Sequence, residues 1–561
     1  MERLSLEIFR RALSTGLAPM ASTAWCLGVC FHLGCIPFEM DNQGWRLIGC
    51  FYSAVVLLTY AYVTVAGFDV YESGKRAAVA GISFNAGVLT SISLYRLFSH
   101  QLRRFPGPIL ARLSRFYAMR LASKRKQLYV EVQELHRQHG DFVRVGPREI
   151  SINRASAIPL IYGPPSRCQK SPWYSQVSTD VTEVSINSTR DMEVHRRRRR
   201  AWDRSFSSKA LLNYEPRVKA KTDALISQLR AKQGKPVDAT KWAMFFSFDV
   251  MGDVGLGKDF HTLDTGNEHP AIKGIHDSIT AIGLLTPVPW LLAMLGAIPG
   301  AMGGYTEFMD YCSAQVDEKE RTLNRAENPS DLISWLLKAR YEGDQSAPPG
   351  KGALHEDARL IIIAGSDTTA AALATTLYYL ATTPRVFKKL QRQLDAAFPH
   401  GDNEWGYAKT KQIAYLDAVI NEALRLNPPA PGGLPRVTPP EGLRVDEVHI
   451  PGDTIVGVPA YTLQRDERYF ERAGEFVPER WNEAGTGAET AAFMPFSRGA
   501  FNCAGKRLAL MELRMVVSRV VPGFDLAVAD SDAVNGFAAG QVDSFILISP
   551  PLPLRFLVRQ A

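Results

Sequence analysis

The chain has few cysteines, and none stands in a pattern typical of a structural site. Its 561 residues include 7 cysteines, four within the first 50 residues and three beyond them. They are Cys26, Cys30, Cys35, Cys50, Cys168, Cys312 and Cys503. No CxxC pair and no Cys/His spacing typical of zinc ligands occurs. These absences argue against a disulfide framework or a structural zinc site, and they favour a reducing compartment for the main body.

The chain also lacks a strong excess of one charge and has no internal repeats. Lysine and arginine number 65 against 57 acidic residues, a net charge of +8 that is spread along the sequence. So small and diffuse an excess does not indicate a nucleic-acid partner. Apolar residues make up 46% of the chain, which is enough for a sizeable core. We therefore expect an ordered protein that does not bind nucleic acid.

Charge is absent from three runs near the N-terminus, residues 16–38, 47–68 and 77–95. Each is long enough to cross roughly 30 Å of hydrocarbon as a helix. A single cleaved signal peptide would leave two runs unexplained, so we predict up to three transmembrane helices. The first run contains two prolines and the third is rich in glycine and serine, so either could instead lie at the membrane interface. A buried helical hairpin is the bland alternative.

Basic residues gather just after the third run, between Arg96 and Lys126. The positive-inside rule places this flank in the cytosol. Within it, the Phe-Pro-Gly-Pro stretch at 105–108 ends the helix in a stiff turn. We therefore predict a membrane anchor in residues 1–104 and a cytosolic body in residues 105–561 that lies on the membrane.

The body is expected to be mainly helical with small β-sheets. Residues 141–145 and 149–152 alternate apolar and polar side chains across a Gly-Pro turn, which predicts two short strands. Most of the chain from there to about residue 430 has helical character. The predicted fold class is thus mainly α with small sheets, preceded by transmembrane helices.

Cys503 lies in a glycine-rich stretch that precedes a periodic apolar run. This pattern predicts a loop that delivers a thiol to the N-terminus of a helix, where backbone N–H groups favour a thiolate. Such a thiolate can be a nucleophile, a zinc ligand or the axial ligand of a haem. Cys503 could also be an ordinary buried cysteine, because free cysteine packs as a small hydrophobe.

A second unusual stretch, residues 359–373, is apolar on all sides but carries Asp367 and Thr368 in its middle. A buried helix holds such groups only when they have partners. Gly365 weakens the helix there, and hydroxyl groups that bond back to the main chain can open it locally. An acid beside an alcohol in an opened helix could deliver protons through water. Alternatively, the two groups merely satisfy each other.

Charged residues elsewhere have both ordinary and functional interpretations. The basic run at 195–200 could be a solvated helix face or a nuclear-localisation signal, or it could pair with buried carboxylates. Within this run, His195 and Arg199 share a helix face and could reach one anionic group. Glu422 and Arg425, three residues apart, most often form a surface ion pair. Two more arginines, Arg436 and Arg480, lie in proline-containing segments.

Taken together, from about residue 105 to the C-terminus, these motifs resemble those of the cytochrome P-450 family, and the sequence looks like a fungal, membrane-anchored member. The resemblance implies a haem b whose axial ligand is the thiolate of Cys503, shielded by Phe496. It implies that Asp367 and Thr368 form the acid–alcohol pair of the oxygen-activation helix. It implies that the haem propionates are contacted by His195, Arg199 and Arg436. It also implies a buried structural triad of Glu422, Arg425 and Arg480.

One position departs from the family pattern. The family usually has arginine or histidine two residues before the cysteine, in contact with a haem propionate, and this chain has Phe501 there. The change removes one charge-assisted contact, worth roughly 1.5–3 kcal/mol if nothing replaces it. Haem binding is still expected, because other propionate partners remain.

The resemblance implies a monooxygenase that uses O2 and two electrons to oxidise a hydrophobic small molecule. No glycine loop for NADPH is evident, so the electrons would come from an NADPH–cytochrome P-450 reductase on the same membrane, which the family places in the endoplasmic reticulum. Lys506 and Arg507 could steer an acidic partner. Alternatives are a haem-thiolate isomerase or dehydratase that needs no reductase, and a non-catalytic haem-binding membrane protein. Intact Asp367 and Thr368 argue against both.

The resemblance also suggests where substrate would bind. The expected stretches are 171–190, the helix from Ala364, 432–434 and 542–545, which are mostly uncharged. A hydrophobic substrate could therefore enter from membrane lipid. By analogy with fungal members of this build, the pathway would belong to secondary metabolism of terpenoids, alkaloids or polyketides.

Overall fold

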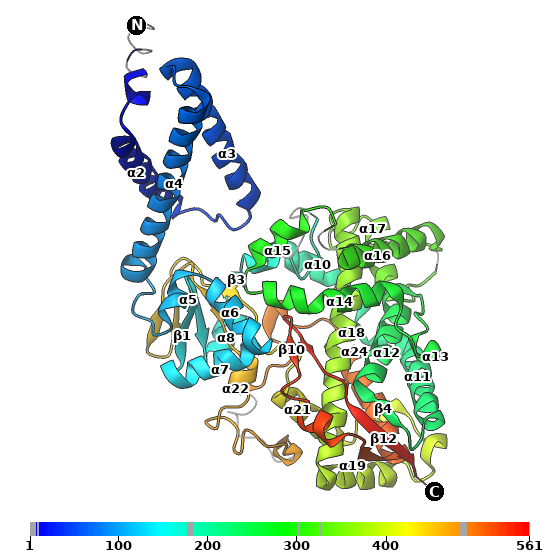
Figure 1. The fold of residues 1–561 in the computed structure, drawn as a ribbon. Helices are drawn as coiled ribbons and strands as arrows, with labels where there is room; N and C mark the ends of the chain where they lie inside the picture. Colours follow the sequence, from blue (N-terminus) through cyan, green and yellow to red (C-terminus); the bar gives the residue numbers. More distant parts are fainter. Residues whose placement is uncertain are drawn as a thin grey trace. The chain divides into compact units, whose positions relative to one another are not determined.

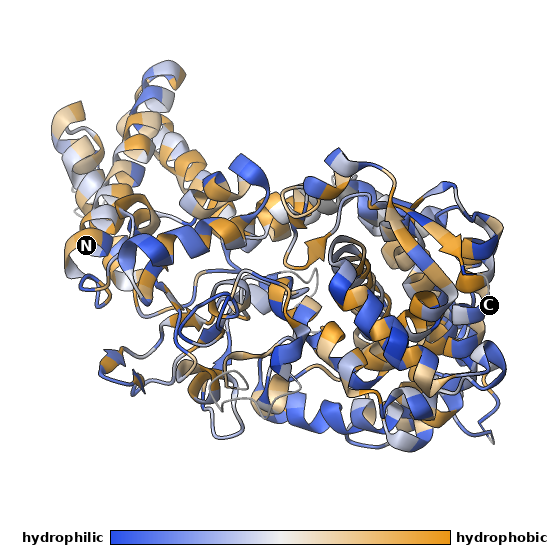
Figure 2. Cartoon of the chain, turned by 90° about the horizontal axis from the view of Figure 1, so that it is seen from below, coloured by the Kyte–Doolittle hydropathy of each residue, from blue (hydrophilic) through white to orange (hydrophobic). Residues whose placement is uncertain are grey.

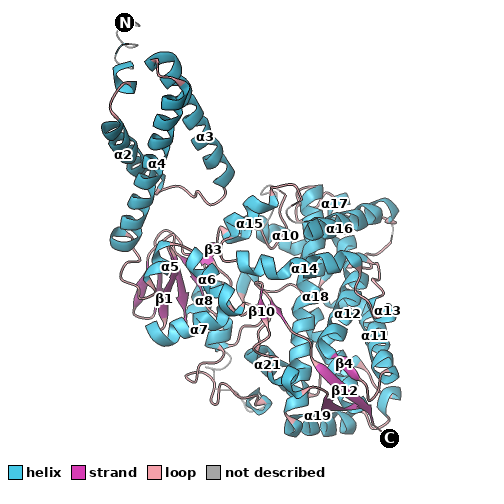
Figure 3. Ribbon diagram, viewed as in Figure 1, coloured by secondary structure: helices cyan, strands magenta, loops and turns pink. Residues whose placement is uncertain are grey.

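The computed structural model describes residues 7, 10–176, 183–300, 303–325, 327–481 and 491–559. The chain divides into two compact units, one made of Met1–Arg115 with Gly146–Arg148 and the other of Phe116–Val145 with Glu149–Ala561. Figure 1 shows the ribbon, and Figure 3 shows that helices dominate it while strands are few and short. The prediction of a mainly helical fold with small sheets is therefore confirmed.

The first unit holds the three uncharged runs, and each forms a long helix. α2 spans Leu17–Cys35, α3 spans Gly44–Ala61 and continues as the π-helix η1 (Tyr62–Ala66), and α4 spans Val70–Leu94 and continues as η2 (Tyr95–Ser99). All three are long and apolar enough to cross a membrane, and only 6%, 6% and 28% of their most apolar windows is buried. Figure 2 shows apolar residues along these helices. This outward apolar surface fits a membrane anchor.

Two glycines bring α2 and α4 into backbone contact. A Cβ atom on Gly28 would lie 2.1 Å from the carbonyl oxygen of Phe84, and one on Gly87 would lie 2.1 Å from that of Trp25. The two positions thus accept only glycine while the helices cross this closely. Small residues at a crossing are typical of helices that pair in lipid. A hydrogen bond of 2.8 Å between His32 Nδ1 and Ser91 Oγ joins the same two helices.

The helices of the rest of the chain run in the following order. After α5 (Ile109–Leu113) come α6 (Phe116–Arg125), α7 (Leu128–His139), α8 (Ala157–Tyr162), α9 (Trp173–Gln176), α10 (Met192–Ser205), α11 (Ser208–Ala231), α12 (Ala239–Met251), η3 (Gly252–Leu256), α13 (Thr262–Thr265), α14 (Pro270–Leu285), α15 (Pro289–Gly296) and α16 (Gly303–Thr322). They continue with α17 (Leu332–Tyr341), α18 (Lys351–Thr382), α19 (Pro384–Ala397), η4 (Gly401–Asn403), α20 (Tyr407–Thr410), α21 (Ala414–Leu426), α22 (Ala460–Leu463), η5 (Pro478–Trp481), η6 (Gly499–Phe501), α24 (Lys506–Gly523) and α25 (Ser531–Asn535).

The strands form small sheets, the largest of which has the order β1-β2-β8-β5-β3. Its strands are β1 (Phe142–Gly146), β2 (Glu149–Ile152), β3 (Gln169–Lys170), β5 (Arg436–Val437) and β8 (Ile455–Gly457). The two strands predicted around the Gly-Pro turn are β1 and β2. β3 pairs with β5 antiparallel, and the register places Lys170 opposite Arg436. This pairing matters because both side chains belong to the site described below.

Three smaller groups of strands complete the described sheets. A three-stranded sheet has the order β4-β12-β9, and two hairpin-like pairs are β6-β7 and β10-β11. Their bounds are β4 (Pro236–Asp238), β6 (Leu443–Val445), β7 (Val448–Ile450), β9 (Phe524–Val528), β10 (Val542–Asp543), β11 (Leu547–Ile548) and β12 (Pro553–Val558).

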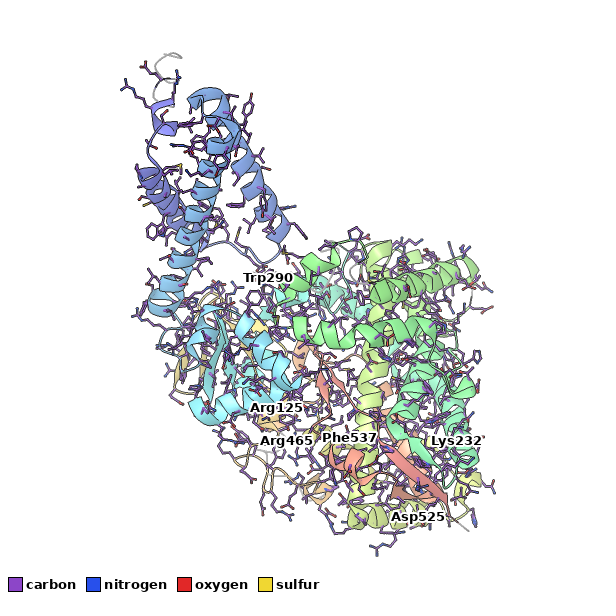
Figure 4. The ribbon with its side chains drawn as sticks, in the orientation of Figure 1. Arg125, Lys232, Trp290, Arg465, Asp525 and Phe537 are labelled. Carbon is purple, nitrogen blue, oxygen red and sulfur yellow. The ribbon has the colours of Figure 1, made fainter. Side chains whose placement is uncertain are left out.

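The core of the second unit is built around α18. Its composition alone would allow a membrane span, but 72% of its apolar window is buried inside the protein. It packs tightly against α12, because a Cβ atom on Gly365 would lie 2.6 Å from Met251 Sδ. Farther along, the ring of Tyr378 stacks on that of Phe537, labelled in Figure 4, with centroids 4.6 Å apart. Packing on several sides explains why α18 has no polar face.

A buried ion cluster ties α21 to the segment that follows α22. The guanidinium of Arg425 donates to both carboxylate oxygens of Glu422, at 2.9 and 2.8 Å, and both side chains are fully buried. Arg480 Nε and the indole N–H of Trp481 also donate to Glu422, at 3.1 and 2.9 Å. Arg425 further donates to the backbone carbonyls of Gln464, Ala473 and Glu475. The three residues that the resemblance groups as a buried structural triad therefore meet in the core, and only the surface position suggested by the spacing of Glu422 and Arg425 is wrong.

Because the cluster is buried, removing the carboxylate of Glu422 should destabilise the folded protein strongly. Glu422→Ala leaves Arg425 buried without a carboxylate, which should lower the free energy of unfolding by about 3–5 kcal/mol. The matched control is Glu193→Ala, because Glu193 and Arg196 form a pair with the same spacing at 2.6 Å but with both side chains exposed. The control should change stability by less than about 0.5 kcal/mol. Urea unfolding followed by circular dichroism measures both, and equal effects would contradict the prediction.

Candidate active site

The cysteine loop, residues 496–503, has a fixed backbone shape. The backbone N–H of Cys503 donates to the carbonyl of Phe496 at 2.9 Å and closes the loop. Ser497 and Gly499 take positive φ values of 56° and 66°. A Cβ atom at Gly499 would lie 2.2 Å from the carbonyl oxygen of Tyr162, so this position requires glycine for both reasons. The loop delivers Cys503 just ahead of α24, as the sequence predicts.

A cavity of about 310 Å³ lies between this loop and α18. Cys503 and Phe496 line one side, and Gly365 and Thr368 of α18 line another. Most other lining residues are apolar, such as Leu360. The cavity can therefore hold a largely apolar group between the thiol and the middle of α18.

The electrostatics of the thiol are balanced between opposing effects. Burial raises the pKa of the Cys503 thiol, while the N–H groups of Gly505 and Lys506 and the guanidinium of Arg199 act to lower it. The exposed surface of Cys503 belongs to the cavity wall. The helix end thus favours the thiolate, as predicted, but burial outweighs it. A coordinating metal ion deprotonates a thiol outright and would reverse this balance.

The basic helix α10 contributes residues with three different tasks. Arg198 is fully buried and pairs with Asp357 at 2.8 Å, which fits the interpretation that one face of the run meets buried carboxylates. Arg199 lines the cavity and donates at 2.8 Å to both the carbonyl and the side-chain oxygen of Asn502. It therefore clamps the cysteine loop. Arg196, by contrast, lies at the surface.

Phe501 is surrounded by cationic and imidazole groups. The ring of His195 meets it edge-on with centroids 4.5 Å apart. The ammonium of Lys170 lies 4.6 Å from the ring centroid, and the guanidinium carbon of Arg436 lies 5.0 Å from it. Both cations are buried. An aromatic face attracts cations, so Phe501 serves as a platform for charges where the family usually has a charge.

Neither Lys170 nor Arg436 has a carboxylate within ion-pair distance among the described residues. Burial and the neighbouring arginines hold the pKa of Lys170 well below its usual range. Burial, Lys170 and the arginines lower the pKa of His195 to about 2. His195 Nδ1 and Arg436 Nε are buried and have no hydrogen-bond partner within the described part of the chain. The site thus carries uncompensated positive charge and orphaned donors.

This arrangement fits the group that the sequence predicts. A haem combines an apolar macrocycle, two carboxylates and an iron that binds thiolate. The apolar cavity, the orphaned donors around Phe501 and the thiol of Cys503 match those three parts. Lys170 is the functional candidate that the sequence did not reveal, because it stands in no motif and only the pairing of β3 with β5 places it beside Arg436.

Asp367 and Thr368 lie on different faces of α18. Thr368 lines the cavity, and its hydroxyl donates to the carbonyl of Ala364 at 2.7 Å. The side chain of Asp367 is buried outside the cavity wall and faces α14, where His276 Nε2 lies 3.4 Å from its Oδ1. Neighbouring residues of a helix point about 100° apart, which accounts for the separation. α18 remains a continuous α-helix here, so the local opening expected at Gly365 does not occur.

The predicted substrate-facing stretches contribute unequally to the cavity. Ile186 and Asn187 from 171–190 line it, as do Gly433 and Leu434. Residues 177–182 lie outside the described residues. None of the described residues 542–545 is part of its wall.

Comparisons with known proteins agree with this site. The family model for cytochrome P-450 matches residues 106–556. A cytochrome P-450 monooxygenase, FCK2, of Fusarium pseudograminearum is 40% identical over 90% of this chain and 91% of its own length. A second, orf5 of Eupenicillium brefeldianum, is 39% identical over 88% and 98%. Tryprostatin B 6-hydroxylase of Aspergillus fumigatus is 33% identical over 90% of each chain.

A solved structure shares the fold. The crystal structure of a cytochrome P-450 haem domain superposes with a TM-score of 0.66, covers 78% of this chain and 95% of its own, and is 18% identical. The family model covers most of this chain, and the curated relatives are more than 30% identical to it over most of its length. The chain therefore belongs to the cytochrome P-450 family, whose members are haem-thiolate monooxygenases.

Proposed function

We propose that this protein is a membrane-bound monooxygenase that holds haem b through Cys503 and inserts one oxygen atom from O2 into a hydrophobic small molecule. The observation that carries the proposal is that one cavity is lined by Cys503, Thr368 and His195 and is bordered by buried positive charge. A thiol, a proton-handling hydroxyl and an anion-binding end are the three parts that such a reaction needs.

We infer that four side chains bind the haem carboxylates. Arg436 and Lys170 supply buried positive charge, His195 supplies a neutral N–H donor, and Arg199 lies beside them on the clamp over the cysteine loop. When bound, the haem iron supplies the site for O2 activation, and a thiolate ligand favours O–O cleavage. Phe496 forms the wall next to Cys503. In this proposal Lys170 replaces the charge that Phe501 does not provide.

The proton donors of the reaction are proposed to be Thr368 and Asp367. Thr368 lies on the cavity wall, where its hydroxyl can hold a water in place and pass a proton toward the cavity. Asp367, one residue earlier, is the acid that replenishes protons from the far side of α18. The apolar walls exclude bulk water, so protons reach the cavity through these groups rather than at random.

Electrons are proposed to come from NADPH through a separate reductase on the same membrane. Lys506 and Arg507 are exposed at the start of α24, close in sequence to Cys503. Positive charge on this face would guide an acidic flavoprotein toward the haem by the shortest route. The proposed place is the endoplasmic reticulum, with residues 1–104 as the anchor and residues 105–561 in the cytosol. The start of the family match at residue 106 supports this division.

The proposed substrate is a hydrophobic fungal secondary metabolite of the terpenoid, alkaloid or polyketide type. The apolar lining of the cavity supports a hydrophobic substrate. One relative is named as a hydroxylase of tryprostatin B, which supports an oxidation of this general kind.

The central test uses the full chain in membranes with a reductase, comparing wild type with Cys503→Ser. The wild type should give the Soret shift of a thiolate-ligated haem with CO, and its expression host should form new metabolites that take up ¹⁸O from ¹⁸O2 and require NADPH. Cys503→Ser should lose the shift and the products, because serine cannot supply a thiolate. Products that form without reductase would indicate an isomerase instead. A Soret shift that is retained in Cys503→Ser would refute the assignment of Cys503 as the axial ligand.

Thr368→Ala tests proton delivery at the cavity wall. Without the hydroxyl, we expect hydrogen peroxide released per product to rise, because protons reach the bound oxygen less selectively. The matched control is Thr382→Ala, whose hydroxyl makes the same kind of bond back along α18, to Tyr378 at 2.8 Å, but lies outside the cavity. Peroxide assays and product quantification measure the ratio. An unchanged ratio in Thr368→Ala would remove this residue from the mechanism.

Lys170→Met tests whether the buried lysine replaces the missing charge at Phe501. Losing a charge-assisted contact of roughly 1.5–3 kcal/mol should speed haem loss to an apomyoglobin acceptor about 10- to 100-fold. Lys241→Met is the control, because its ammonium also lies over an aromatic ring, that of Phe245, but at the surface. The double variant Lys170→Met with Phe501→Arg should regain haem retention. Haem loss from Lys170→Met at the wild-type rate would contradict this role.

A further inference from the structure

Three titratable side chains, those of Glu268, His276 and Asp367, form a row that leads from the surface to α18. The carboxylate of Glu268, just before α14, contacts Nδ1 of His276 on α14. On its other side, His276 Nε2 lies 3.4 Å from Asp367 Oδ1 on α18. One imidazole therefore bridges two carboxylates that belong to separate segments of the fold.

The exposed fraction of the side chain falls in steps along this row of three residues. The side chain of Glu268 is 22% exposed, that of His276 is 16% exposed and that of Asp367 is 4% exposed. The outer carboxylate thus meets solvent while the inner one does not. Such a gradient is what a path for protons through a protein wall requires, because each group can exchange a proton with the next.

The described groups that face His276 favour its charged form. They are Glu268 from the segment before α14, Asp367 from α18 and the ring of Phe248 from α12, whose centroid lies 5.5 Å away at 77°. Burial lowers the pKa of His276, but the two carboxylates outweigh it and raise the pKa to about 10. On the same helix, Lys273 and Asp277 pair with each other at the surface. His276 is therefore an imidazolium at neutral pH.

Asp367 is held loosely and has one free oxygen. Its contact with His276 is longer than the usual 2.7–3.2 Å of an N–H···O hydrogen bond. Its second oxygen, Oδ2, is buried and lacks a hydrogen-bond partner among the described residues. The adjacent residue, Thr368, lines the cavity. Asp367 is therefore the sequence neighbour of a cavity residue and carries a buried oxygen that no described residue holds.

We infer that His276 is a positioning residue that keeps Asp367 on the outer face of α18 and, with Glu268, forms the route by which protons reach Asp367 from solvent. In each cycle the N–H bond at Nε2 of the imidazolium breaks and an O–H bond forms at Asp367 Oδ1. This neutralises the pair and frees Asp367 to turn. The neutral imidazole keeps its proton on Nδ1, so it regains the second one when the ring turns the bare Nε2 toward the solvent-facing Glu268 end, takes up a proton from solvent there and turns back. The inference rests on the proposed function, in which Asp367 supplies protons for the reduction of O2.

The first test measures the ion pair without any turnover. A pKa of about 10 in the folded state, above the ordinary 6.5, means that His276 stabilises the fold fully below pH 6.5 and loses this effect as pH rises toward 10. The melting temperature of wild type should therefore exceed that of His276→Gln most near pH 6, and the difference should shrink by pH 10. His261→Gln is the control, because His261 also pairs with a carboxylate, Asp264 at 3.1 Å, but is 63% exposed. A difference in melting temperature that does not change with pH would contradict the claim that His276 is a charged imidazolium in the folded protein.

The second test separates this route from the function on which it rests. With reductase, NADPH and no added substrate, O2 is reduced either to peroxide with one NADPH or to two waters with two. His276→Gln and Asp367→Asn should each raise peroxide per NADPH by the same factor and slow water formation about tenfold. Glu268→Gln should act in the same direction, and His261→Gln should not.

The outcomes of the second test are distinct. An effect of Asp367→Asn alone would overturn the role of His276 while leaving Asp367 as the proton donor. No effect from either variant, in protein that keeps the thiolate spectrum, would overturn the proposed role of Asp367. Equal effects that disappear when the pH is lowered, where protons are plentiful, would support the route, and effects that persist unchanged at low pH would indicate a structural cause instead.

Discussion

The site depends most on buried positive charge that has no carboxylate partner among the described residues. Lys170 and Arg436 lie opposite each other on two paired short strands, and both cationic groups lie within about 5 Å of the centroid of the Phe501 ring. Desolvated cations are costly unless an anion accompanies them. A ligand with carboxylates would supply that anion, so its binding energy would also be folding energy. In the proposed function, the same constraint lets an aromatic residue stand two positions before Cys503, because Lys170 on a neighbouring strand would supply the charge.

The two faces of α18 divide the chemistry of the site. Thr368 faces the cavity and Asp367 faces α14, because consecutive residues of a helix point about 100° apart. Gly365 allows α18 to approach Met251 so closely that its rotation about its own axis is fixed. This rotation turns Thr368 toward the cavity and Asp367 toward α14, which are the positions that the proposed proton delivery requires. A helix that is apolar on all sides packs against neighbours on all sides and cannot rotate about its axis. The directions of its few polar side chains are therefore fixed.

The N-terminal unit solves a different physical problem. Its helices expose apolar side chains that water would not tolerate, and lipid satisfies them without a protein partner. Gly28 and Gly87 let two of the helices meet at the backbone, which suits an environment where hydrophobic driving force between helices is absent.

The sequence by itself determined the features that depend on local spacing and polarity: three apolar helices, two strands around a turn, and a glycine-rich loop that presents Cys503 to a helix. It also indicated Glu422 and Arg425 as a pair, which spacing alone placed at the surface and the family resemblance placed in a buried triad with Arg480. Only the tertiary structure brought Lys170 beside Arg436 and set His276 against Asp367. These contacts join residues far apart in the chain, and no local pattern encodes them. They follow from how helices and strands pack, because packing alone fixes which side chains share a dry interior.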